Sequence, residues 1–421
     1  MQSKQSTAVI GTGISGMGAA YLLHPSNDLT VYEQGDYIGG HTRTREVDYE
    51  GTRIAVDTGF IVFNNRNYPH LSALFKRLNV PVEKSNMSFA ISVQQGAFEW
   101  GARSLNAVFG QRSNLLSPRF WGMIADVKRF FREAPALLET QTTLSLGELL
   151  EQMKMGEGFR RYFLLPMGGA IWSCPVETML DFPALTFVRF FHNHGLLTFN
   201  DQPQWYTVSG GAREYVSRLT APFRDSIRLN CGVTSVKRTE NGVEITDVTG
   251  QTKPYDRVVF ACHGDQALRL LQDATTNERA VLGAFTYQKN TAFLHRDIRQ
   301  MPKRRACWAS WVYASDGASR PDALAVTYWM NLLQNIDERT PLFVTLNPIT
   351  PIPEALIFDQ TEFEHPVFSA QAIAAQARIH EIQGTNRAWF CGAYQRYGFH
   401  EDGLNSAVEM AALMGVSPPW Q

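Results

Sequence analysis

The sequence predicts an α/β (α+β) fold in which a parallel sheet with helices on its faces is interleaved with a second domain of mixed sheet and helices. A β-branched run at 7–10 ends in a glycine, apolar residues recur at helical spacing over 14–23, and a second strand-like run follows at 29–32. This strand–helix–strand order is how a Rossmann-type dinucleotide-binding domain begins. Farther along, strand-like segments alternate with aromatic-rich helical segments, which indicates two domains built from discontinuous pieces.

Two patterns of apolar residues, alternation in strands and helical spacing in helices, predict the later elements. Alternating or β-branched runs predict strands at 233–236, 243–246, 257–261, 323–329, 342–346 and 388–391. Helical spacing of apolar residues predicts helices over 370–382 and 404–413.

The composition is that of a folded chain with a large apolar interior. Of its 421 residues, 44% are hydrophobic and 12% aromatic, while only 19% are charged. Length alone predicts two or three domains. The surplus of aromatic side chains has two interpretations. One is a large core, and the other is an apolar cavity that encloses a flat cofactor or a hydrophobic substrate. The formal net charge of −1 predicts no nucleic-acid partner.

Cysteine usage and the N-terminal segment indicate where the protein works. The five cysteines are far apart and none has CxxC spacing, which argues against a disulfide scaffold or a Cys-rich zinc site. The polar start at 1–6 has no apolar signal region, and no apolar run approaches the length of a membrane span. We therefore expect a reduced, cytoplasmic setting and no bound metal.

The segment 103–138 mixes aromatic and aliphatic side chains with Arg and Lys, and most of it predicts one long amphipathic helix. Its apolar face has two interpretations that both stay open. One is buried packing. The other is peripheral attachment to a membrane interface, since basic and aromatic residues share the segment.

A glycine-rich turn is the strongest local signal. Gly11 permits a tight turn from strand to helix, Gly13 lets the backbone approach a pyrophosphate, and Gly16 lets helix and strand pack closely. Glu33 lies 22 residues after Gly11 at the end of the next strand, where an acid holds ribose hydroxyls. The alternative is a glycine-rich turn that binds no nucleotide. The residues expected to contact a dinucleotide here are Gly11, Gly13, Ile14, Ser15, Gly16, Glu33 and Gln34.

The sequence that follows resembles the flavoprotein superfamily of monoamine oxidase, protoporphyrinogen oxidase and phytoene desaturase. The stretch 39–44 (GGHTRT) matches that superfamily's E-x5-GGR-x-x-T element, with His41 in place of its arginine. Arg43 either compensates for that change or faces solvent. A D-x-G stretch at 57–59 matches the part of the superfamily that lies near the flavin. The resemblance implies FAD as the cofactor, with contacts from Gly40, His41, Thr42, Asp57, Thr58 and Gly59.

Two later segments resemble the remaining FAD-binding parts of this superfamily. The stretches 231–236 and 256–261 are similar to the segment whose valine faces the adenine. The stretch 390–404 is similar to the C-terminal motif, in which a strand ends in glycine and a helix N-terminus points at the flavin. The residues implied are Val233, Gly392, Ala393, Asp402, Gly403 and Leu404.

The resemblance covers the chain from end to end and divides it into two domains. It implies a discontinuous FAD-binding domain at 1–100, 205–285 and 386–421. The substrate domain then comprises 101–204 and 286–385.

Four shorter strings resemble a bacterial subgroup described as predicted NAD/FAD-binding flavoproteins. They lie at 171–173, 193–197, 209–211 and 399–404. Some members of that subgroup are tied to cyclopropane-type or methylated fatty-acyl modification, which implies a hydrophobic small-molecule or acyl-lipid substrate.

We therefore expect an FAD-dependent oxidoreductase that abstracts hydride from a hydrophobic C–H substrate, such as a fatty-acyl chain. The cofactor accepts the hydride, while the protein orients the substrate and excludes water. Two alternatives stay open. One is an amine oxidase or polycyclic-substrate oxidase of the same fold, and the other is a flavin isomerase or mutase without net redox turnover. The oligomeric state is open as well.

Candidate catalytic side chains are few. By resemblance, His400 stands where amine oxidases have one wall of their aromatic cage, so it either orients substrate, takes a proton, or is a structural histidine.

The other candidate side chains each have a structural alternative. Cys174 is a packing cysteine or a redox-active thiol. Lys289 matches the lysine that holds water near the flavin in amine oxidases, or lies on the surface. His192 and His194 do not share a helix face, which argues against a metal pair. Phe182, Phe187, Phe190 and Phe191 line an acyl channel or form plain core.

Overall fold

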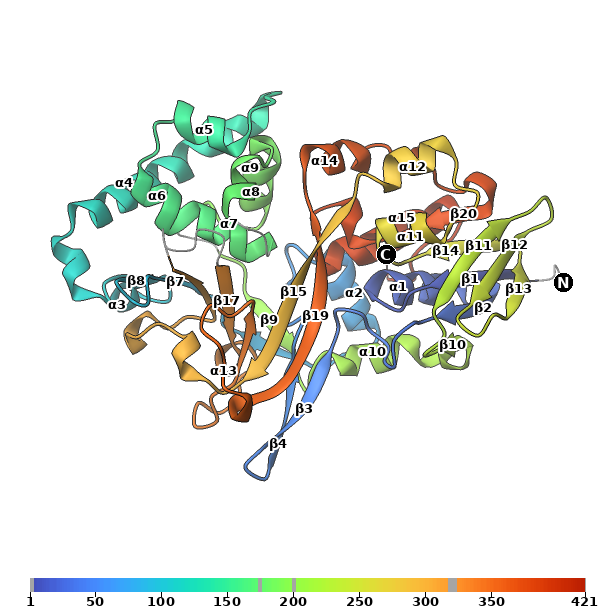
Figure 1. The fold of residues 1–421 in the computed structure, drawn as a ribbon, viewed down its shortest axis with the longest axis horizontal. Coiled ribbons are helices and arrows are strands. Elements are labelled where there is room, and N and C mark those ends of the chain that lie inside the picture. Colours follow the sequence, from blue (N-terminus) through green and yellow to red (C-terminus); the bar gives the residue numbers. More distant parts are fainter. Residues whose placement is uncertain (1–3, 173–175, 199–201, 317–323, 421) are drawn as a thin grey trace.

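The computed structural model describes residues 4–172, 176–198, 202–316 and 324–420. Figure 1 shows an elongated molecule with two halves joined by long central strands. One half holds a parallel sheet and the N-terminus, and the other holds most of the helices between residues 100 and 195. The α/β prediction is confirmed.

A five-stranded parallel sheet forms the first half. Its order is β10 (Ile227–Arg228), β2 (Asn27–Tyr32), β1 (Gln5–Ile10), β14 (Arg257–Phe260) and β20 (Ala388–Phe390). The last residue of β1 pairs with the last residues of β2 and β14, and those of β14 and β20 pair in turn. The carboxyl ends of these four strands are therefore aligned, and ligands of open α/β sheets bind at that edge.

Two buried helices cover this sheet and pack on each other. Every residue of α1 (Ile14–Leu23) is buried, because the sheet lies on one side of it and α15 (His400–Leu413) on another. The bounds of α1 match the expected 14–23. The helix expected at 404–413 begins four residues earlier, because Asp402 accepts a hydrogen bond from the backbone N–H of Phe399 and caps the helix there.

A seven-stranded mixed sheet forms the centre of the molecule, in the order β19-β15-β18-β17-β16-β7-β8. Its strands are β7 (Phe89–Val93), β8 (Phe98–Gly101), β15 (Thr286–His295), β16 (Trp311–Ser315), β17 (Leu324–Trp329), β18 (Phe343–Leu346) and β19 (Ile357–Val367). The strands β7 and β8 thus belong to this sheet, although they fall in the segment 1–100 assigned above to the other domain. We propose the two-domain division with its first boundary before β7.

Three smaller sheets accompany the two large ones among the described residues. They contain the hairpin β3 (Thr44–Tyr49) and β4 (Thr52–Asp57), the trio β5 (Val62–Asn64), β9 (Trp205–Val208) and β6 (Val82–Ser85), and the trio β11 (Val233–Arg238), β12 (Val243–Asp247) and β13 (Thr252–Tyr255). The remaining helices of the first half and the central region are α2 (Pro69–Arg77), α10 (Arg213–Thr220), α11 (Gly264–Leu270), α12 (Thr276–Leu282), α13 (Met330–Leu333) and α14 (Ala370–Gln376). The helix expected over 370–382 ends as α14 at residue 376, and a short 3-10 turn follows.

The helical half contains α3 (Leu105–Val108), α4 (Pro118–Glu133), α5 (Leu146–Gln152), α6 (Glu157–Phe159), α7 (Leu165–Trp172), α8 (Val176–Leu180) and α9 (Ala184–Asn193). The long amphipathic helix expected within 103–138 is α4, which covers residues 118–133. The chain breaks between α3 and α4, where Ser117 caps the new helix and Pro118 occupies its first position. Within α4 the apolar face is buried, as its residues Phe120, Met123, Val127 and Phe130 are.

Among the described residues, no helix combines the length and the apolar character that crossing a bilayer would require.

Candidate functional site

The glycine turn lies at the carboxyl end of β1. Gly11 has a φ of +105°, and a Cβ there would stand 2.9 Å from the carbonyl oxygen of Ala261. A Cβ on Gly16 would stand 2.0 Å from the carbonyl oxygen of Gly11. Gly13 differs, because a Cβ there would meet nothing within 4 Å. Two glycines are thus required by protein packing, while the third borders open space at the uncapped N-terminus of α1.

Glu33 follows β2 and is held beside this turn. Its Oε2 accepts hydrogen bonds from the Thr12 backbone N–H at 3.0 Å and from the Thr12 hydroxyl at 2.5 Å. Its Oε1 accepts from the backbone N–H of Gly35 at 2.8 Å. Sequence reasoning missed Thr12, because the motif treats that position as variable.

The segment expected to face an adenine lies next to Glu33. The backbone N–H of Cys231 donates to the Glu33 carbonyl at 2.8 Å, and a Cβ on Gly232 would stand 3.0 Å from Cβ of Gln34. Val233 opens β11 immediately afterwards. The structure therefore brings Glu33, Gln34 and Val233 together, although about 200 residues separate them in the sequence.

The N-termini of α1 and α15 converge. A Cβ on Gly403 would stand 2.8 Å from both Cγ2 of Ile14 and Oγ of Ser15. Two helix N-termini at one place concentrate N–H donors and positive potential, which suits an anionic or electron-rich ligand.

The side chains of α15 expected to serve a cofactor are largely committed to the protein. Leu404 is fully buried, and its Cδ1 would stand 2.8 Å from a Cβ on Gly18. Asp402 accepts from the backbone N–H of Phe399 at 2.9 Å, and burial raises the pKa of Asp402 to about 6. Gly392 donates its N–H to the Ser406 hydroxyl at 2.8 Å, and Ala393 follows in a 3-10 turn.

Asp57 is a buried carboxylate whose two oxygens bind protein groups. Oδ1 accepts from the Thr44 hydroxyl at 2.5 Å, and both oxygens accept from the backbone N–H of Ala212. Oδ2 also accepts from Nε2 of Gln334 at 2.9 Å. Burial raises the pKa of Asp57 to about 7. Asp57 thus joins β4 to α10 and α13, and these bonds leave neither oxygen uncommitted.

The loop 40–42 packs onto the glycine turn and onto residues 58–59. A Cβ on Gly40 would stand 3.0 Å from Cα of Gly13, and one on Gly59 would stand 2.1 Å from the His41 carbonyl oxygen. Thr58 donates its hydroxyl to the Arg43 carbonyl at 3.1 Å. These residues are therefore adjacent, as the motif implies.

Arg43 does not face solvent. Its guanidinium forms an ion pair with Asp359 of β19, and both side chains are 12% exposed. That ion pair ties the loop 40–44 to the central sheet.

Three imidazoles from three distant segments meet beside this loop. His41 stacks on Phe363 with ring centroids 4.8 Å apart and lies 5.3 Å from His365. His263 stacks on Tyr287 at 4.1 Å. Burial lowers the pKa of all three, and their mutual repulsion lowers the pKa of His41 and His365 further, that of His365 reaching about 4.

The Nε2 atom of His41 is buried and has no hydrogen-bond partner among the described residues. A buried polar atom of this kind needs an explanation. Because His41 borders the glycine turn, a bound ligand would supply the missing partner.

His400 occupies the first turn of α15 and is enclosed. Its ring stacks on Phe60 with centroids 3.9 Å apart and an interplanar angle of 12°. Its Nε2 lies 2.6 Å from the Tyr215 hydroxyl and 3.3 Å from that of Thr42, and these two hydroxyls also bond to each other. Burial lowers the pKa of His400 to about 3, so its imidazole is neutral at physiological pH.

Glu401 is a further residue that motif reasoning missed. Its two oxygens accept from the backbone N–H groups of His70 at 2.8 Å and Leu71 at 2.9 Å. Burial raises the pKa of Glu401 to about 7. The carboxylate satisfies donors at the start of α2 and so ties that helix to α15. No sequence signal links two segments 330 residues apart.

The aromatic residues of α7 to α9 form a packed cluster. Phe187 and Phe191 stack at 4.1 Å, and Trp172 lies 4.7 Å from Phe190 and 4.9 Å from Phe182. These phenylalanines are therefore core residues. The Nε1 atom of Trp172 is buried within the cluster without a hydrogen-bond partner among the described residues. Cys174 lies outside the described residues.

Two other candidate groups lie away from the glycine turn. Lys289 is 69% exposed and pairs loosely with Glu362 at 3.9 Å, so it lies on the surface. His194 stacks on Phe190 at 3.8 Å, while His192 is exposed.

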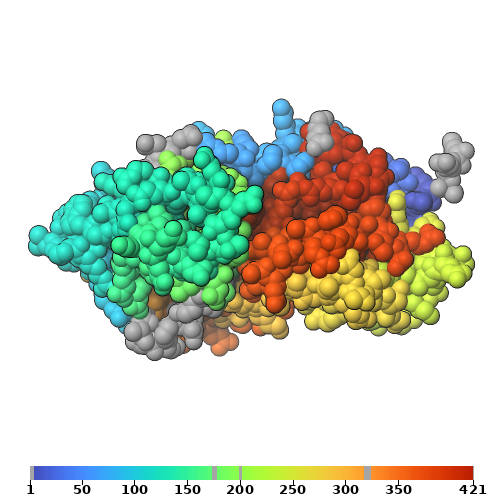
Figure 2. Space-filling model, turned by 90° about the horizontal axis from the view of Figure 1, so that it is seen from above, coloured from blue at the N-terminus to red at the C-terminus, as the bar shows by residue number. Residues whose placement is uncertain are grey.

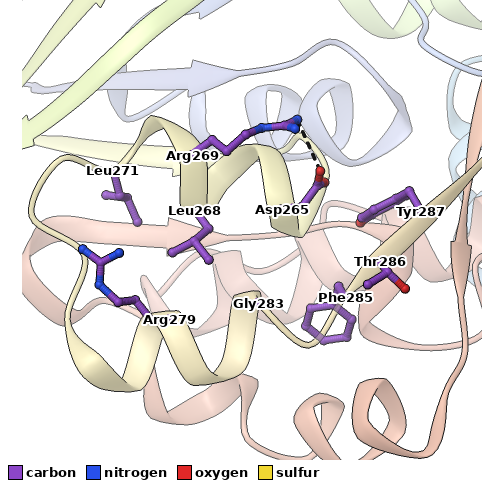
Figure 3. A pocket seen from close by; sticks show the side chains of 9 residues that line it. All are labelled: Asp265, Leu268, Arg269, Leu271, Arg279, Gly283, Phe285, Thr286 and Tyr287. Atoms are coloured by element: carbon purple, nitrogen blue, oxygen red, sulfur yellow. Dashed lines mark ion pairs between the residues drawn. The ribbon is translucent and has the colours of Figure 1, made fainter.

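Two of the hollows in the surface of the described residues lie near these elements. One, of about 490 Å³, is lined by Arg66, Pro135, His192, Asn193, Gly195, Leu197 and Thr198. The other, of about 630 Å³, lies over α11, α12 and the start of β15 (Figure 3). In the second, Asp265 pairs with Arg269 at 3.2 Å. Its residue Tyr287 is the one that stacks on His263, so this hollow backs onto the imidazole cluster.

The residues present fit FAD. Open space beside Gly13 leaves room for a pyrophosphate at two converging helix N-termini, Glu33 stands where a ribose would lie, and the unpartnered Nε2 of His41 borders the same turn. Fold and site together define a dinucleotide-binding flavoprotein.

Comparison with known proteins identifies the family. Residues 14–286 match the model of the flavin-containing amine oxidoreductases, and the chain belongs to this family. Amine oxidase [flavin-containing] B from Bos taurus is 26% identical over 257 residues, which cover 58% of this chain. That alignment spans 47% of the bovine protein, about half its length. Membership of this family makes FAD the cofactor of this chain.

Solved structures share its fold. A CLA-producing fatty acid isomerase from P. acnes has a TM-score of 0.69 at 15% identity, with 99% of each chain covered. The cyclohexylamine oxidase from Brevibacterium oxydans IH-35A has the same TM-score and identity, with 98% of this chain and 100% of that chain covered.

Proposed function

We propose that the protein oxidises or desaturates a long hydrophobic substrate, such as a fatty-acyl chain, at a C–H bond. When bound, FAD supplies the hydride acceptor, and oxygen or a quinone-type acceptor reoxidises it. In a desaturation the carbon beside the oxidised one loses a proton as the C=C bond forms, so atoms and charge balance. The protein's own residues hold the cofactor, align the chain and exclude water.

The observation that carries this proposal is an aromatic link between the helical half and the start of α15. Phe190 of α9 stacks on Phe399 at 5.1 Å and lies 5.5 Å from Tyr397. Phe399 directly precedes His400 at the helix N-terminus. Phe190 is buried, whereas the rings of Tyr397 and Phe399 are partly exposed, and these two rings favour an apolar substrate carbon beside the start of α15.

The hollow of about 490 Å³ lies at the end of α9, the helix that carries Phe190. It is lined by residues 192, 193 and 195, which follow Phe190 at the end of α9. Arg66 and the apolar Leu197 share its lining. Pro135 and Leu197 give this lining an apolar part, which suits the hydrocarbon chain of an acyl substrate.

Cofactor binding in this proposal uses the residues implied by the motifs. The backbone of Gly13, Ile14, Ser15 and Gly16 faces the pyrophosphate, Glu33 holds the ribose, and the N-terminus of α15 faces the flavin. His400 acts through position rather than charge, because it is neutral and its Nε2 is already bonded. We therefore assign it as a positioning residue.

Two alternatives differ in outcome. An amine oxidase would act on a substrate that carries an amino group, and the rings of Phe399 and Tyr397 offer that group no charged partner. An isomerase would move a double bond along an acyl chain with no net redox change, and the shared fold with a fatty acid isomerase supports keeping this candidate.

Matched substrates separate these functions. The FAD-loaded protein is mixed anaerobically with a long-chain fatty acid or with the primary amine of equal chain length, and absorbance of the flavin band is followed. We expect the acid to bleach the band and, in air, to yield peroxide or reduce a quinone. Bleaching by the amine alone would overturn the proposal. Conversion of the acid to a positional isomer with an oxidised flavin at the end would establish the isomerase.

A further inference from the structure

The end of the helical half carries an unusual concentration of exposed apolar side chains. Among the described residues, nine large hydrophobic side chains are exposed, and four of them lie between residues 105 and 121. They are Leu105 at 79%, Leu115 at 45%, Leu116 at 89% and Trp121 at 47%. We call residues 103–121 the tip segment. Single exposed hydrophobic residues are ordinary, but a local cluster of four indicates a contact surface.

The charge of the tip segment has one sign. It contains Arg103, Arg112 and Arg119, all exposed, and the chain has no Asp or Glu between Glu99 and Asp126. Further cations lie close by, because a Cβ on Gly110 would stand 2.5 Å from Sγ of Cys307, in the loop that carries Lys303 and Arg305. The apolar cluster is therefore rimmed by positive charge.

The tip segment holds its exposed side chains in a fixed arrangement. Nε1 of Trp121 donates to the Leu115 carbonyl at 3.0 Å, and the Arg112 guanidinium donates to the Phe109 carbonyl at 3.0 Å. Phe109 packs beneath, with its ring 5.6 Å from that of Trp121. Exposure of these side chains is thus a property of the folded segment.

The tip segment lies at one end of the molecule. Figures 1 and 2 place the chain around residues 100–130 at the end of the long axis opposite the N-terminus and the parallel sheet. This end can meet a broad surface without obstruction from the rest of the protein.

We propose that the tip segment docks the protein peripherally on an anionic lipid bilayer. The leucines and Trp121 insert among head groups and upper acyl chains, while the arginines pair with anionic lipids. A bilayer fits better than a protein partner, because leucine and tryptophan side chains beside the three exposed arginines match both layers of an anionic interface, although Arg305 nearby pairs with Glu338. The inserting part is the tip before α4, since the apolar face of α4 itself is buried.

Vesicle binding tests this proposal with the full-length, FAD-loaded protein. Co-sedimentation is measured with vesicles of phosphatidylcholine alone and of phosphatidylcholine with phosphatidylglycerol. We expect binding to the mixed vesicles, weaker binding to the neutral ones, and a loss of affinity as salt rises. The double variant Leu105→Ser/Leu116→Ser should bind the mixed vesicles at least about tenfold less tightly, since two leucines no longer insert.

The control is Ile298→Ser/Leu413→Ser, which removes two exposed apolar side chains elsewhere at 56% and 63% exposure. It should bind like wild type, and both variants should keep the wild-type flavin spectrum. Brominated lipids should quench fluorescence of wild type more than that of Trp121→Phe.

Three results would overturn the proposal. They are absence of binding to mixed vesicles, an equal loss in both double variants, and a self-association in sedimentation equilibrium that the tip variant abolishes. The last would assign the tip segment to a contact between copies of this chain. Vesicle binding requires no turnover, so its failure would leave the proposed reaction untouched.

Discussion

At the scale of single residues, His400 shows how a candidate catalytic group becomes a positioning group once its surroundings are known. The imidazole is stacked on Phe60 and bonded to Tyr215, and its burial lowers the pKa to about 3. A neutral ring with one nitrogen committed to a buried tyrosine is poorly placed to exchange protons with a substrate.

Tyr215→Phe tests this role of the hydroxyl network. The change leaves Nε2 of His400 without its 2.6 Å partner, so the free energy of unfolding should fall by about 1–3 kcal/mol. The rate of flavin reduction should change by only about a fewfold, because the hydroxyl acts through another side chain. Urea unfolding and stopped-flow absorbance measure the two effects. A drop in rate of a thousandfold with unchanged stability would instead make the network part of the chemistry.

Some single-residue roles could be predicted from the sequence, and others depend on contacts between distant segments. The glycine pattern predicts which positions must lack a side chain. At Gly11 and Gly16 a Cβ would clash with a backbone carbonyl oxygen. The same pattern gives no information about Tyr215, because its partner His400 is 185 residues away. Arg43 was assigned to the cofactor or to solvent, and its ion pair with Asp359 depends on a strand that only the folded sheet brings near.

At the scale of elements, the meeting of α1 and α15 is the feature that builds the site. The bounds of α1 could be predicted because apolar spacing, an initial glycine turn and a following proline all agree. The start of α15 could not, because its capping box has Phe399 where the usual signature has Ser or Thr. That shift matters, since it places His400 and Glu401 inside the helix.

Gly403→Ala probes the contact between these two helices. The added Cβ would stand 2.8 Å from Ile14 and Ser15, so the helices must separate, with a loss of about 1–3 kcal/mol in stability. FAD affinity should fall at least about tenfold, because the two N-termini move apart. Isothermal titration with FAD measures the second effect.

The matched control is Gly122→Ala in α4, where a Cβ would meet nothing within 4 Å. Helix propensity predicts a small gain in stability of up to about 1 kcal/mol for this control. A Gly403→Ala protein that binds FAD like the control would contradict the proposed convergence at the cofactor.

At the scale of the whole molecule, three distant chain segments together form the imidazole cluster. His41 comes from a loop, His263 from the N-terminus of α11, and His365 from β19. Composition indicated a large apolar interior, and motif order indicated interleaved domains. The imidazole cluster could not be predicted, since it depends on the register of a sheet formed by distant strands.

The cluster predicts a pH dependence of stability. The folded state holds the pKa of His365 at about 4, against about 6.5 when unfolded, so the unfolded chain binds more protons between these values. Stability contributed by this neutral imidazole is full above pH 6.5 and falls as pH drops toward 4. The slope is about 1.4 kcal/mol per pH unit for one histidine.

His365→Gln should flatten this slope, measured as the urea midpoint between pH 7 and pH 4.5, while the exposed His380→Gln should not. The comparison of variants matters, because Asp57 and Glu401, with pKa values raised to about 7, contribute slopes of opposite sign in the same window. Identical pH profiles for the two variants would show that the buried cluster does not control acid stability.

The central claim is that the open space beside Gly13 receives the FAD pyrophosphate. The most direct measurement is the visible absorption spectrum of wild-type and Gly13→Val proteins after incubation with FAD and gel filtration. Gly13 has extended backbone angles that valine adopts, and its Cβ would touch no protein atom within 4 Å, so the variant should fold like wild type by circular dichroism. We predict a flavin band in wild type and none in Gly13→Val. A flavin band of equal strength in the folded variant would contradict the account.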